Sequence, residues 1–334
     1  MLGALALAFV VSLLGAFGYR RFAPLDVPNE RSSHSRPIPR GGGVAIVLGF
    51  GVGLSAWLAA ANSLSPRALG WLAGALLVAA VSFADDVRSL PAGPRLAVHV
   101  LGALLLTLVG VQQRELPVLL ALPLAFVWIA LVTNIYNFMD GIDGLAASQA
   151  VIAGAALAIA GTVVGNSLVS IGGGLIAAAS AGFLTQNLPP ARLFMGDVGS
   201  TFLGFNFAGL SLLGNLGVGG GRLPIEFGIV VLAPFLFDSV VTLARRIAGG
   251  ERWYAAHRSH FYQRLVSHGL SHALVTGLYA ALAVVAAVAA LLGLVLEEPL
   301  RQVLAVVAYA PMLAVVAWVW RLDASHVVSP GRSS

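Results

Sequence analysis

The acidic residues of this chain occur in three short motifs that could hold a cation. The first, "SFADDVRSL", ends an apolar run with Asp85 and Asp86. Two adjacent carboxylates repel each other, so at least one of them favours a proton or a cation. A pair of solvated acids at the end of a helix is the alternative interpretation of this motif.

The second motif, "NFMDGIDGLA", places Asp140 and Asp143 three residues apart. The two carboxylates would share a face if the segment were helical, and Asn134 and Asn137 would add neutral oxygen ligands one turn apart. A charge at the middle of a bilayer costs roughly 2.5–3.5 kcal/mol, so two acids between apolar runs indicate an aqueous cavity or a metal ion. An ordinary polar loop is the alternative.

The third motif, "LFMGDVGSTFLGF", sets Asp197 between Gly196 and Gly199 just before another apolar run. A carboxylate there can bind Mg²⁺, and the free N–H groups at the start of the next helix can bind a phosphate. Capping of that helix by Asp197 or Ser200 is an equally good interpretation.

Two basic segments could bind phosphate. The longer one, residues 245–272, contains His257 and His260 among arginines and aromatic residues, and these groups suit phosphate oxygens. The shorter one, "DVPNERSSHSRPIPRGGGVAI", contains His34, Arg40 and three glycines whose N–H groups could surround an anion. For the longer segment, contact with anionic lipid headgroups is the alternative, and His-x-x-His without a third ligand is poor evidence for zinc.

The composition places these motifs in a membrane protein. Of 334 residues, 58% are hydrophobic and 10% are charged, and the mean hydropathy is +0.91, which is typical of a helical membrane protein. The chain has no cysteine, which excludes disulfides and thiolate metal sites, and its 19 basic residues are all arginine. Although the pI is about 10.2, no nucleic-acid-binding motif is present, so we expect no nucleic-acid partner.

The elements that must position these motifs are about eleven predicted transmembrane helices in an all-α fold, within a single domain of residues 1–334. We expect the first run to be retained, because it lacks the features of a signal peptide. His99 and Asp238 fall inside predicted spans, where we expect hydrogen bonds between helices. The predicted spans lie near residues 2–19, 42–61, 68–84, 96–111, 117–134, 145–164, 167–185, 200–215, 225–244, 273–295 and 301–320.

Arginine predicts the orientation of these spans. If the loop after the first span is cytoplasmic, fifteen arginines lie on the cytoplasmic side and four, Arg67, Arg114, Arg222 and Arg301, lie on the other side. Cytoplasmic loops carry the excess of basic residues, so we predict a periplasmic N-terminus and a cytoplasmic C-terminus. All three acidic motifs and both basic segments then lie on the cytoplasmic side.

The segments "RSSHSRPIPRGGG", "FADD", "NIYNFMDGIDGLA", "LFMGDVGS" and "AHRSHFYQRL" resemble, in sequence and order, the polyprenyl-phosphate N-acetylhexosamine-1-phosphate transferases, or glycosyltransferase family 4. The likeness runs from about residue 26 to residue 272. It implies Mg²⁺-dependent transfer of a sugar 1-phosphate from a UDP-N-acetylhexosamine to undecaprenyl phosphate, with release of UMP. Mn²⁺ could replace Mg²⁺. The reaction would take place at the cytoplasmic face of the bacterial inner membrane.

The resemblance also assigns roles to individual residues, and it assembles the active site from loops 20–41, 85–95, 134–145, 186–200 and 245–272. It matches the metal-binding positions to Asp197 and Asn137, the acidic motifs to Asp85, Asp86, Asp140 and Asp143, which we predict to be catalytic, and the histidine loop to His257 and His260. We predict that the substrate-binding residues are His257, Arg258, His260, Asn187, Arg40 and His34.

Arg258 and Ser259 separate His257 from His260, whereas the branch that transfers phospho-muramoyl-pentapeptide has three consecutive histidines there. The loop is similar to that of the O-antigen-initiating members, so we expect the first membrane step of an O-antigen-like polysaccharide. Pentapeptide transfer is the alternative. A transporter is less well supported, because the acids gather at one face and no half-repeat is visible. The identity of the hexosamine and the formation of a homodimer stay open.

Two chemical routes are open for the transfer. In direct attack, an oxygen of the polyprenyl phosphate displaces UMP at the sugar-proximal phosphorus, and Asp85 or Asp86 accepts any residual proton. In the two-step route, an aspartate first forms a phosphosugar intermediate. We favour direct attack, because it avoids the approach of a negative carboxylate to a doubly charged diphosphate.

Overall fold

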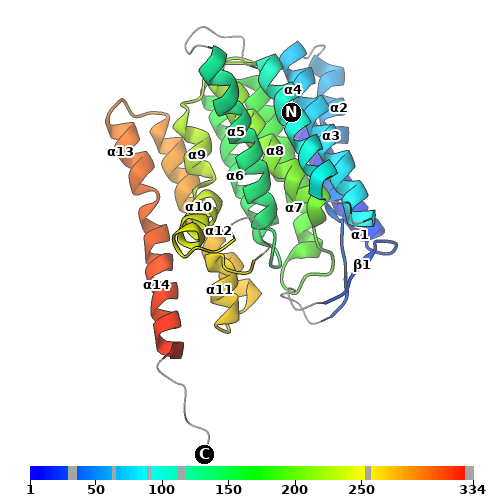
Figure 1. Cartoon of the computed structure of the whole chain (residues 1–334). Coiled ribbons are helices and arrows are strands. Elements are labelled where there is room, and N and C mark those ends of the chain that lie inside the picture. Colours follow the sequence, from blue (N-terminus) through cyan, green and yellow to red (C-terminus); the bar gives the residue numbers. More distant parts are fainter. Residues whose placement is uncertain are drawn as a thin grey trace, which may run out of the picture.

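The structure is a computed structural model that describes residues 1–28, 36–61, 65–88, 90, 92–110, 118–252 and 257–327. Most of these residues form long helices that run side by side in one bundle (Figure 1). The helices are α1 (Leu2–Tyr19), α2 (Gly43–Ala61), α3 (Pro66–Arg88), α4 (Ala92–Gly110), α5 (Val118–Phe138), α6 (Leu145–Val163), α7 (Ser167–Asn187), α8 (Gly196–Asn215), α9 (Glu226–Val231), α10 (Ala233–Ala248), α11 (Phe261–Ser267), α12 (His272–Gly293), α13 (Leu300–Val307) and α14 (Ala310–Val327).

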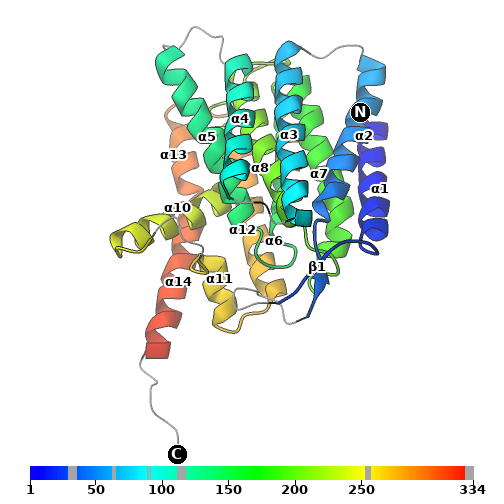
Figure 2. The ribbon, with the colours of Figure 1, turned by 45° about the vertical axis from the view of Figure 1, so that its right-hand side comes forward.

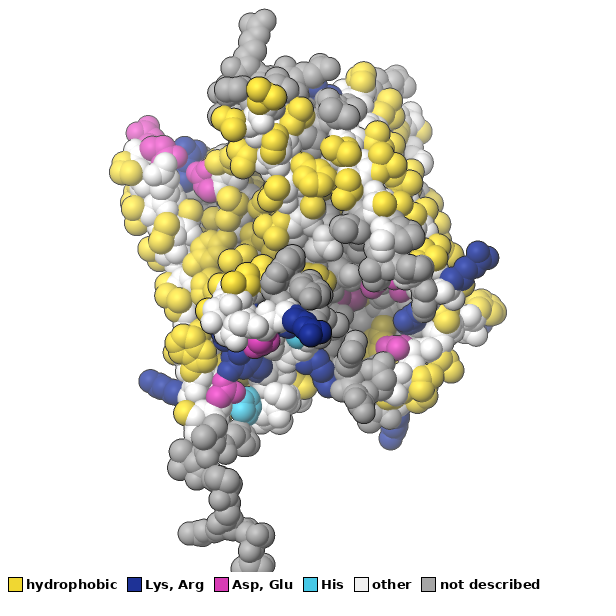
Figure 3. Space-filling view, in the orientation of Figure 1, with side chains coloured by type: hydrophobic (Ala, Val, Ile, Leu, Met, Phe, Trp, Pro, Cys, Tyr) yellow, Lys and Arg dark blue, Asp and Glu magenta, His cyan; other side chains and the backbone are white. Residues whose placement is uncertain are grey.

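Eight segments of the described chain are long and apolar enough to cross a membrane: α1, α2, α3, α5, α6, α7, α12 and the pair α13–α14. On the side of the molecule shown in Figure 3, hydrophobic side chains cover much of the upper part, as a surface in contact with lipid requires. The predicted class, a helical membrane protein that crosses the bilayer several times, is therefore confirmed. The three other predicted spans correspond to α4, α8 and the pair α9–α10.

Helix α8 lies among the other helices, which explains why it is less apolar than a lipid-facing span. Most of its side chains are buried, and α2, α3 and α5 pack on it. A Cβ on Gly204 would come within 2.8 Å of Thr133 Cα, so α5 approaches this closely because α8 has no side chain there. The helix begins at Gly196 rather than at residue 200 as predicted, so Asp197 lies in its first turn.

Two predicted spans are each divided into two helices. In the span predicted at residues 225–244, α9 ends at Val231 and α10 begins at Ala233. Pro234, in the first turn of α10, has no backbone N–H to continue the hydrogen bonds of α9. Gln149 of α6 donates to the carbonyl of Val231 at 3.1 Å, which satisfies an acceptor that the break leaves inside the bundle. Helix α10 then runs sideways out of the bundle (Figure 2). The last predicted span likewise divides into α13 and α14, with Pro311 in the first turn of α14.

The loops that carry the polar motifs lie at one end of the bundle (Figure 2). The loop after α1 includes a short antiparallel hairpin of β1 (Leu25–Asp26) and β2 (Ile38–Pro39). The backbone of Phe194, in the loop after α7, donates to the carbonyl of Pro39 at 2.8 Å and accepts from the N–H of Gly42 at 2.9 Å. The start of α1 and the end of α14 lie toward opposite ends of the bundle (Figure 2).

Candidate active site

The site is organised by Asp86, the last acid of α3. Its two carboxylate oxygens accept the N–H groups of Asp197 and Val198, each at 3.0 Å. Gly196 has a φ of +74°, and a Cβ there would lie 2.7 Å from a carboxylate oxygen of Asp86. Asp86 therefore caps α8, satisfying N–H groups that have no partner inside the helix. The capping interpretation of the third motif was right about the helix end but wrong about the residue, because a distant carboxylate supplies the cap.

Asp140 lies near both Asp86 and Asp197. Burial and the negative charges of Asp197 and Asp86 raise the pKa of Asp140 to about 8. Carboxylates from three separate motifs thus influence one another, and burial together with this repulsion favours the protonated form of Asp140 at neutral pH. A cation or the positive groups of a substrate complex would relieve this repulsion.

Asp143 does not join this group. The structure shows turns and bends, not a helix, between α5 and α6, so the condition for a shared face with Asp140 is not met. One carboxylate oxygen of Asp143 accepts the N–H of Ala191 at 3.0 Å, and the other lies 3.2 Å from His272 Nδ1. These contacts fasten the 134–145 loop to the 186–200 loop and to α12. The carboxylate of Asp85 likewise binds a backbone group of the protein, the N–H of Leu90, at 2.6 Å.

The two asparagines assigned to the site hold its loops together. Asn137 accepts a hydrogen bond from the Ser200 hydroxyl at 2.7 Å, which joins the end of α5 to the first turns of α8. Asn187 is buried, accepts the N–H of Gly144 at 3.1 Å and donates to the carbonyl of Leu193 at 3.0 Å. The roles of Asn137 as a metal ligand and of Asn187 as a substrate contact stay predictions.

Arg40 follows β2 directly and reaches the site from there. Its guanidinium donates twice to the backbone carbonyl of Asp86, at 3.2 Å and 2.8 Å. This contact holds the end of α3 and with it the cap of α8, while the charge of Arg40 stays close to the carboxylates. His34, the other residue predicted from this loop, lies outside the described residues.

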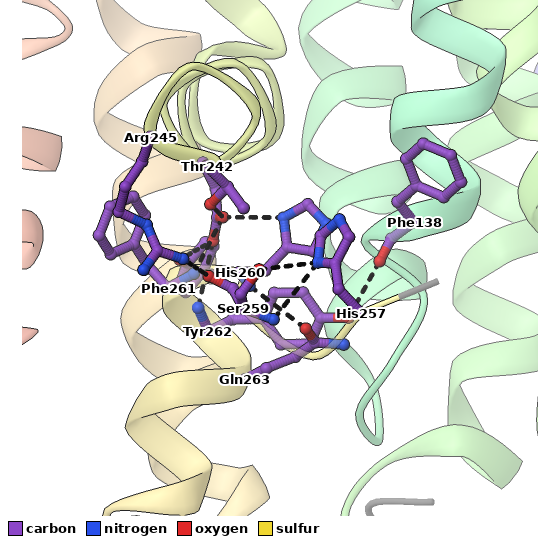
Figure 4. Close-up of polar contacts among 11 residues, drawn as sticks. Phe138, Thr242, Arg245, His257, Ser259, His260, Phe261, Tyr262 and Gln263 are labelled. Carbon is purple, nitrogen blue, oxygen red and sulfur yellow. Dashed lines mark hydrogen bonds and ion pairs between the residues drawn. The ribbon is translucent and has the colours of Figure 1, made fainter. Parts of the chain in front are cut away.

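The histidine loop meets the acidic loop through Tyr262 (Figure 4). The Tyr262 hydroxyl donates to the carbonyl of Phe138 at 2.9 Å, and a Cβ on Gly141 would overlap that hydroxyl. The ring of Tyr262 stacks near that of His260, with 5.8 Å between the ring centres. His260 therefore lies beside the loop that carries Asp140.

His257 is held next to His260, with 5.0 Å between the ring centres. Its Nδ1 lies 2.9 Å from the hydroxyl of Ser259. Burial and the neighbouring charges of His260 and Arg246 lower the pKa of His257 to about 4, so this imidazole is neutral at pH 7. An incoming phosphate would favour its protonation. Arg258, between the two histidines, is exposed.

The donor set fits Mg²⁺ if the substrate supplies further oxygens. Among the described residues, no three His, Asp or Glu side chains are arranged to hold an ion on their own. Mg²⁺ usually takes one or two carboxylates together with water and substrate phosphates. Asp197 and Asp140 could supply the two carboxylates, since the pKa of Asp140 is raised by burial and then by the nearby charge of Asp197.

The raised pKa of Asp140 predicts a pH-dependent affinity for Mg²⁺. Because the folded-state pKa, about 8, is above the ordinary 3.8, the stability that this proton contributes is fully present below about pH 3.8, falls as the pH rises from there and is lost once the pH has passed about 8. We therefore expect the metal-free protein to melt at a lower temperature at pH 8.5 than at pH 6. Because Mg²⁺ must displace the proton, its apparent affinity should rise roughly tenfold per pH unit below pH 8.

Thermal unfolding without Mg²⁺ measures the first trend, and thermal unfolding with UDP at a series of Mg²⁺ concentrations and pH values measures the second, because UDP supplies the phosphate oxygens but cannot react. Asp140→Asn should remove the pH dependence of the Mg²⁺ effect, and Glu298→Gln, which alters an exposed acid near the opposite end of the bundle, should keep it. The same slope in Asp140→Asn and wild type would contradict this interpretation.

Asp238 and Tyr262 are site residues that the sequence analysis missed. The expected bond between helices exists, since the Tyr279 hydroxyl of α12 donates to Asp238 of α10 at 2.5 Å. However, the same carboxylate also binds His260 Nδ1 at 3.1 Å. The available signal was an acid inside an apolar span, which requires several partners. Tyr262 gave no such signal, because an aromatic residue next to a histidine is common in any loop.

These features define a helical membrane protein with an acidic site beside a loop rich in histidine and arginine. The family model described as "Glycosyl transferase family 4" matches residues 68–215. The chain is 32% identical over 286 residues to the probable undecaprenyl-phosphate N-acetylglucosaminyl 1-phosphate transferase of Bacillus subtilis (strain 168), a match that covers 80% of this chain and 79% of that protein. The chain therefore belongs to glycosyl transferase family 4, among the polyprenyl-phosphate N-acetylhexosamine-1-phosphate transferases, as the motifs predicted.

Two further relatives extend the comparison. The decaprenyl-phosphate N-acetylglucosaminephosphotransferase of Mycobacterium tuberculosis (strain ATCC 25618 / H37Rv) is 29% identical over 310 residues, which cover 79% of this chain and 72% of that protein. The phospho-N-acetylmuramoyl-pentapeptide-transferase of Lactiplantibacillus plantarum is 33% identical over 159 residues, 41% of this chain and 49% of that protein. The match to the pentapeptide transferase is thus confined to a smaller part of the chain.

Proposed function

We propose that this protein transfers an N-acetylhexosamine 1-phosphate from a UDP-sugar to undecaprenyl phosphate and releases UMP. The observation that carries the proposal is the meeting of Asp86, Asp140 and Asp197 beside the histidine loop at one end of the bundle. A lipid phosphate cannot leave the bilayer, so a site for it must lie where the helices end. The excess of negative charge suits a reaction between two phosphates that requires a cation.

The favoured sugar is N-acetylglucosamine, because the relatives that match most of the chain are named for it. The product would begin a surface polysaccharide of the O-antigen type. The pentapeptide reaction is less well supported, because Arg258 and Ser259 interrupt the histidines and the similarity to that relative spans less than half of this chain.

The proposed chemistry is direct displacement. An oxygen of undecaprenyl phosphate attacks the sugar-proximal phosphorus, the bond from that phosphorus to the bridging oxygen breaks, and UMP leaves with the electron pair. Bound Mg²⁺ would neutralise the charge that develops on the diphosphate. Asp197 and Asp140 would hold the ion, His257 and His260 would bind donor phosphate oxygens, and Asp86 would keep Asp197 in place by capping α8.

The site would lie on the cytoplasmic side of a bacterial inner membrane, because UDP-sugars are made in the cytoplasm. With eleven spans, a reporter fused after Gly221, in the loop between α8 and α9, should be periplasmic, and a reporter fused after Gly250 should be cytoplasmic. Alkaline phosphatase and fluorescent-protein fusions measure the two locations. The reverse pattern would overturn the orientation predicted from the arginines and with it the location of the site.

Release of UMP by the purified protein tests the function. In detergent with undecaprenyl phosphate and Mg²⁺, UMP should form with at least one of UDP-N-acetylglucosamine, UDP-N-acetylgalactosamine and UDP-N-acetylfucosamine, and we expect the first to be fastest. UDP-N-acetylmuramoyl-pentapeptide completes the panel, and activity with it alone would select the pentapeptide reaction. Uptake of a UDP-sugar into proteoliposomes without UMP would indicate a transporter and contradict the proposal.

A further inference from the structure

Asp238 is a buried carboxylate whose predicted bond between helices accounts for only one of its contacts. The residue is 2% exposed and lies on α10, outside all three acidic motifs. Burying an ionised carboxylate is costly unless hydrogen bonds replace its water. Its two oxygens accept five hydrogen bonds: from Thr242 Oγ1 at 3.2 Å, His260 Nδ1 at 3.1 Å, the N–H of Phe261 at 3.0 Å, the N–H of Tyr262 at 3.1 Å and the Tyr279 hydroxyl at 2.5 Å.

These contacts determine how His260 is presented (Figure 4). Because Asp238 only accepts, Nδ1 of His260 must carry the proton that it shares with Asp238, and Nε2 is left for another partner. The N–H groups of Phe261 and Tyr262 bind the same carboxylate, so the start of α11 cannot turn independently of the imidazole. On the other side, Arg245 donates to the carbonyl of Ser259 at 2.9 Å, which holds the residue before His260.

The same carboxylate also sets the distance from the histidine loop to the acidic loop. Asp238 binds the backbone of Tyr262 at 3.1 Å, and the hydroxyl of Tyr262 donates to Phe138 O at 2.9 Å. Burial, with the charges of Asp238 and Asp140, raises the pKa of Tyr262 well above its usual range, so the phenol keeps its proton and remains a donor. A chain of two hydrogen bonds thus runs from α10 to the loop of Asp140.

We propose that Asp238 is a positioning residue for the transfer reaction: through His260 and Tyr262 it aims Nε2 of His260 at the donor phosphate and holds the histidine loop against the acidic loop. This inference rests on the proposed function and adds a residue that is outside the family motifs found in the sequence. Asp238 itself touches neither substrate, because its oxygens are occupied by groups of the protein.

The test is a double-mutant cycle on kcat. Asp238→Asn keeps the shape of the side chain, and its new NH₂ can donate to the Tyr279 oxygen but opposes the N–H of Tyr262. We expect a fall in kcat of roughly ten- to a hundredfold, by analogy with the loss of a carboxylate that orients a metal-binding histidine. In a His260→Ala background the same change should lower kcat by a clearly smaller factor, because the part of the effect that acts through the imidazole is already lost and only the contact through Tyr262 remains.

Asp323→Asn is the matched control. Asp323 of α14 also pairs with a histidine, His268, directly after α11, with 2.7 Å between its carboxylate and His268 Nε2, but that histidine faces α14 rather than the acidic loop. This control should keep kcat within about twofold. Asp238→Glu, which restores the charge and both acceptors, should recover part of the loss. Equal effects of Asp238→Asn with and without His260, or a normal kcat in Asp238→Asn, would overturn the inference.

Tyr262→Phe gives a second test that does not depend on the folding of an Asp238 variant. It removes only the bond to Phe138, which should lower the melting temperature by no more than a few degrees, and it should lower kcat about tenfold. A normal kcat would also overturn the inference. Binding of UDP, measured by thermal shift, separates the two proposals. A wild type that neither releases UMP nor binds UDP would overturn both, whereas an active wild type with an equally active Asp238→Asn would overturn this one alone.

Discussion

Replacing Asp197 by asparagine should lower turnover roughly a thousandfold, a loss of about 4 kcal/mol of transition-state stabilisation at about 1.4 kcal/mol per tenfold. Asparagine keeps the shape of the side chain but removes a full negative charge, and hard cations such as Mg²⁺ prefer ionised oxygen ligands. The backbone N–H of residue 197, which Asp86 binds at 3.0 Å, is unchanged by the substitution. Helix α8 should therefore still form and the protein should still insert into the membrane.

Turnover as a function of Mg²⁺ concentration, at equal amounts of folded protein, measures this effect. Glu298→Gln is a suitable control, because Glu298 pairs with Arg301 at 2.7 Å in an exposed position outside the site. Asp238 would be a poor control, since it binds His260. Wild-type turnover with unchanged Mg²⁺ dependence in Asp197→Asn would remove Asp197 from the metal site.

Replacing His260 by alanine should lower turnover by two to three orders of magnitude. The imidazole lies beside the acidic loop through the contact of Tyr262 with Phe138, and its loss removes a group that would bind the donor phosphate. His257→Ala should have an effect of the same kind, because the two rings lie 5.0 Å apart. Charge-assisted contacts to phosphate are among the stronger hydrogen bonds in proteins.

The matched control for these variants is His268→Ala, because His268 belongs to the same segment but pairs with Asp323 of α14. Initial rates with UDP-N-acetylglucosamine give kcat and KM for all three variants and wild type. If His257→Ala and His260→Ala turn over like His268→Ala, the segment is a membrane-surface loop and takes no part in binding the donor.

The helices were largely predictable from hydropathy alone, since each predicted span corresponds to a helix or to a pair of helices. The breaks within two of these spans could not be predicted, because proline occurs both at the start of a helix and in the interior of a membrane span. Pro234 and Pro311 each fall in the first turn of the second helix of a pair, where the missing N–H costs nothing. Hydropathy averages across such a position and reports one span.

The three acidic motifs could be found from residue type and spacing, but not which of their members meet. Asp140 and Asp143 are three residues apart, and only a helix would have put them on one face. The structure has turns there, so Asp140 lies near Asp197 and Asp86 while Asp143 binds Ala191 and His272. Local spacing predicts contacts only where the secondary structure is known.

Contacts between motifs that are far apart in the chain could not be predicted from the sequence. The cap of α8 by Asp86 joins residues 111 positions apart, and the pairing of Asp238 with His260 depends on α10 turning sideways after the break at Leu232. Neither leaves a periodic signal, because each depends on how the helices pack. The motifs indicate which side chains matter, and the packing decides which of them bind and which position others.

Transfer of a labelled phosphate tests the central claim most directly. The donor is UDP-N-acetylglucosamine carrying ³²P only in the phosphate next to the sugar, and the acceptor is undecaprenyl phosphate with Mg²⁺. If the protein transfers a sugar 1-phosphate, the label moves into the butanol-extractable lipid and an equal amount of unlabelled UMP appears in the water phase. Label that stays in the water phase as UDP while the sugar enters the lipid, or a lipid phase that gains neither, would contradict the claim.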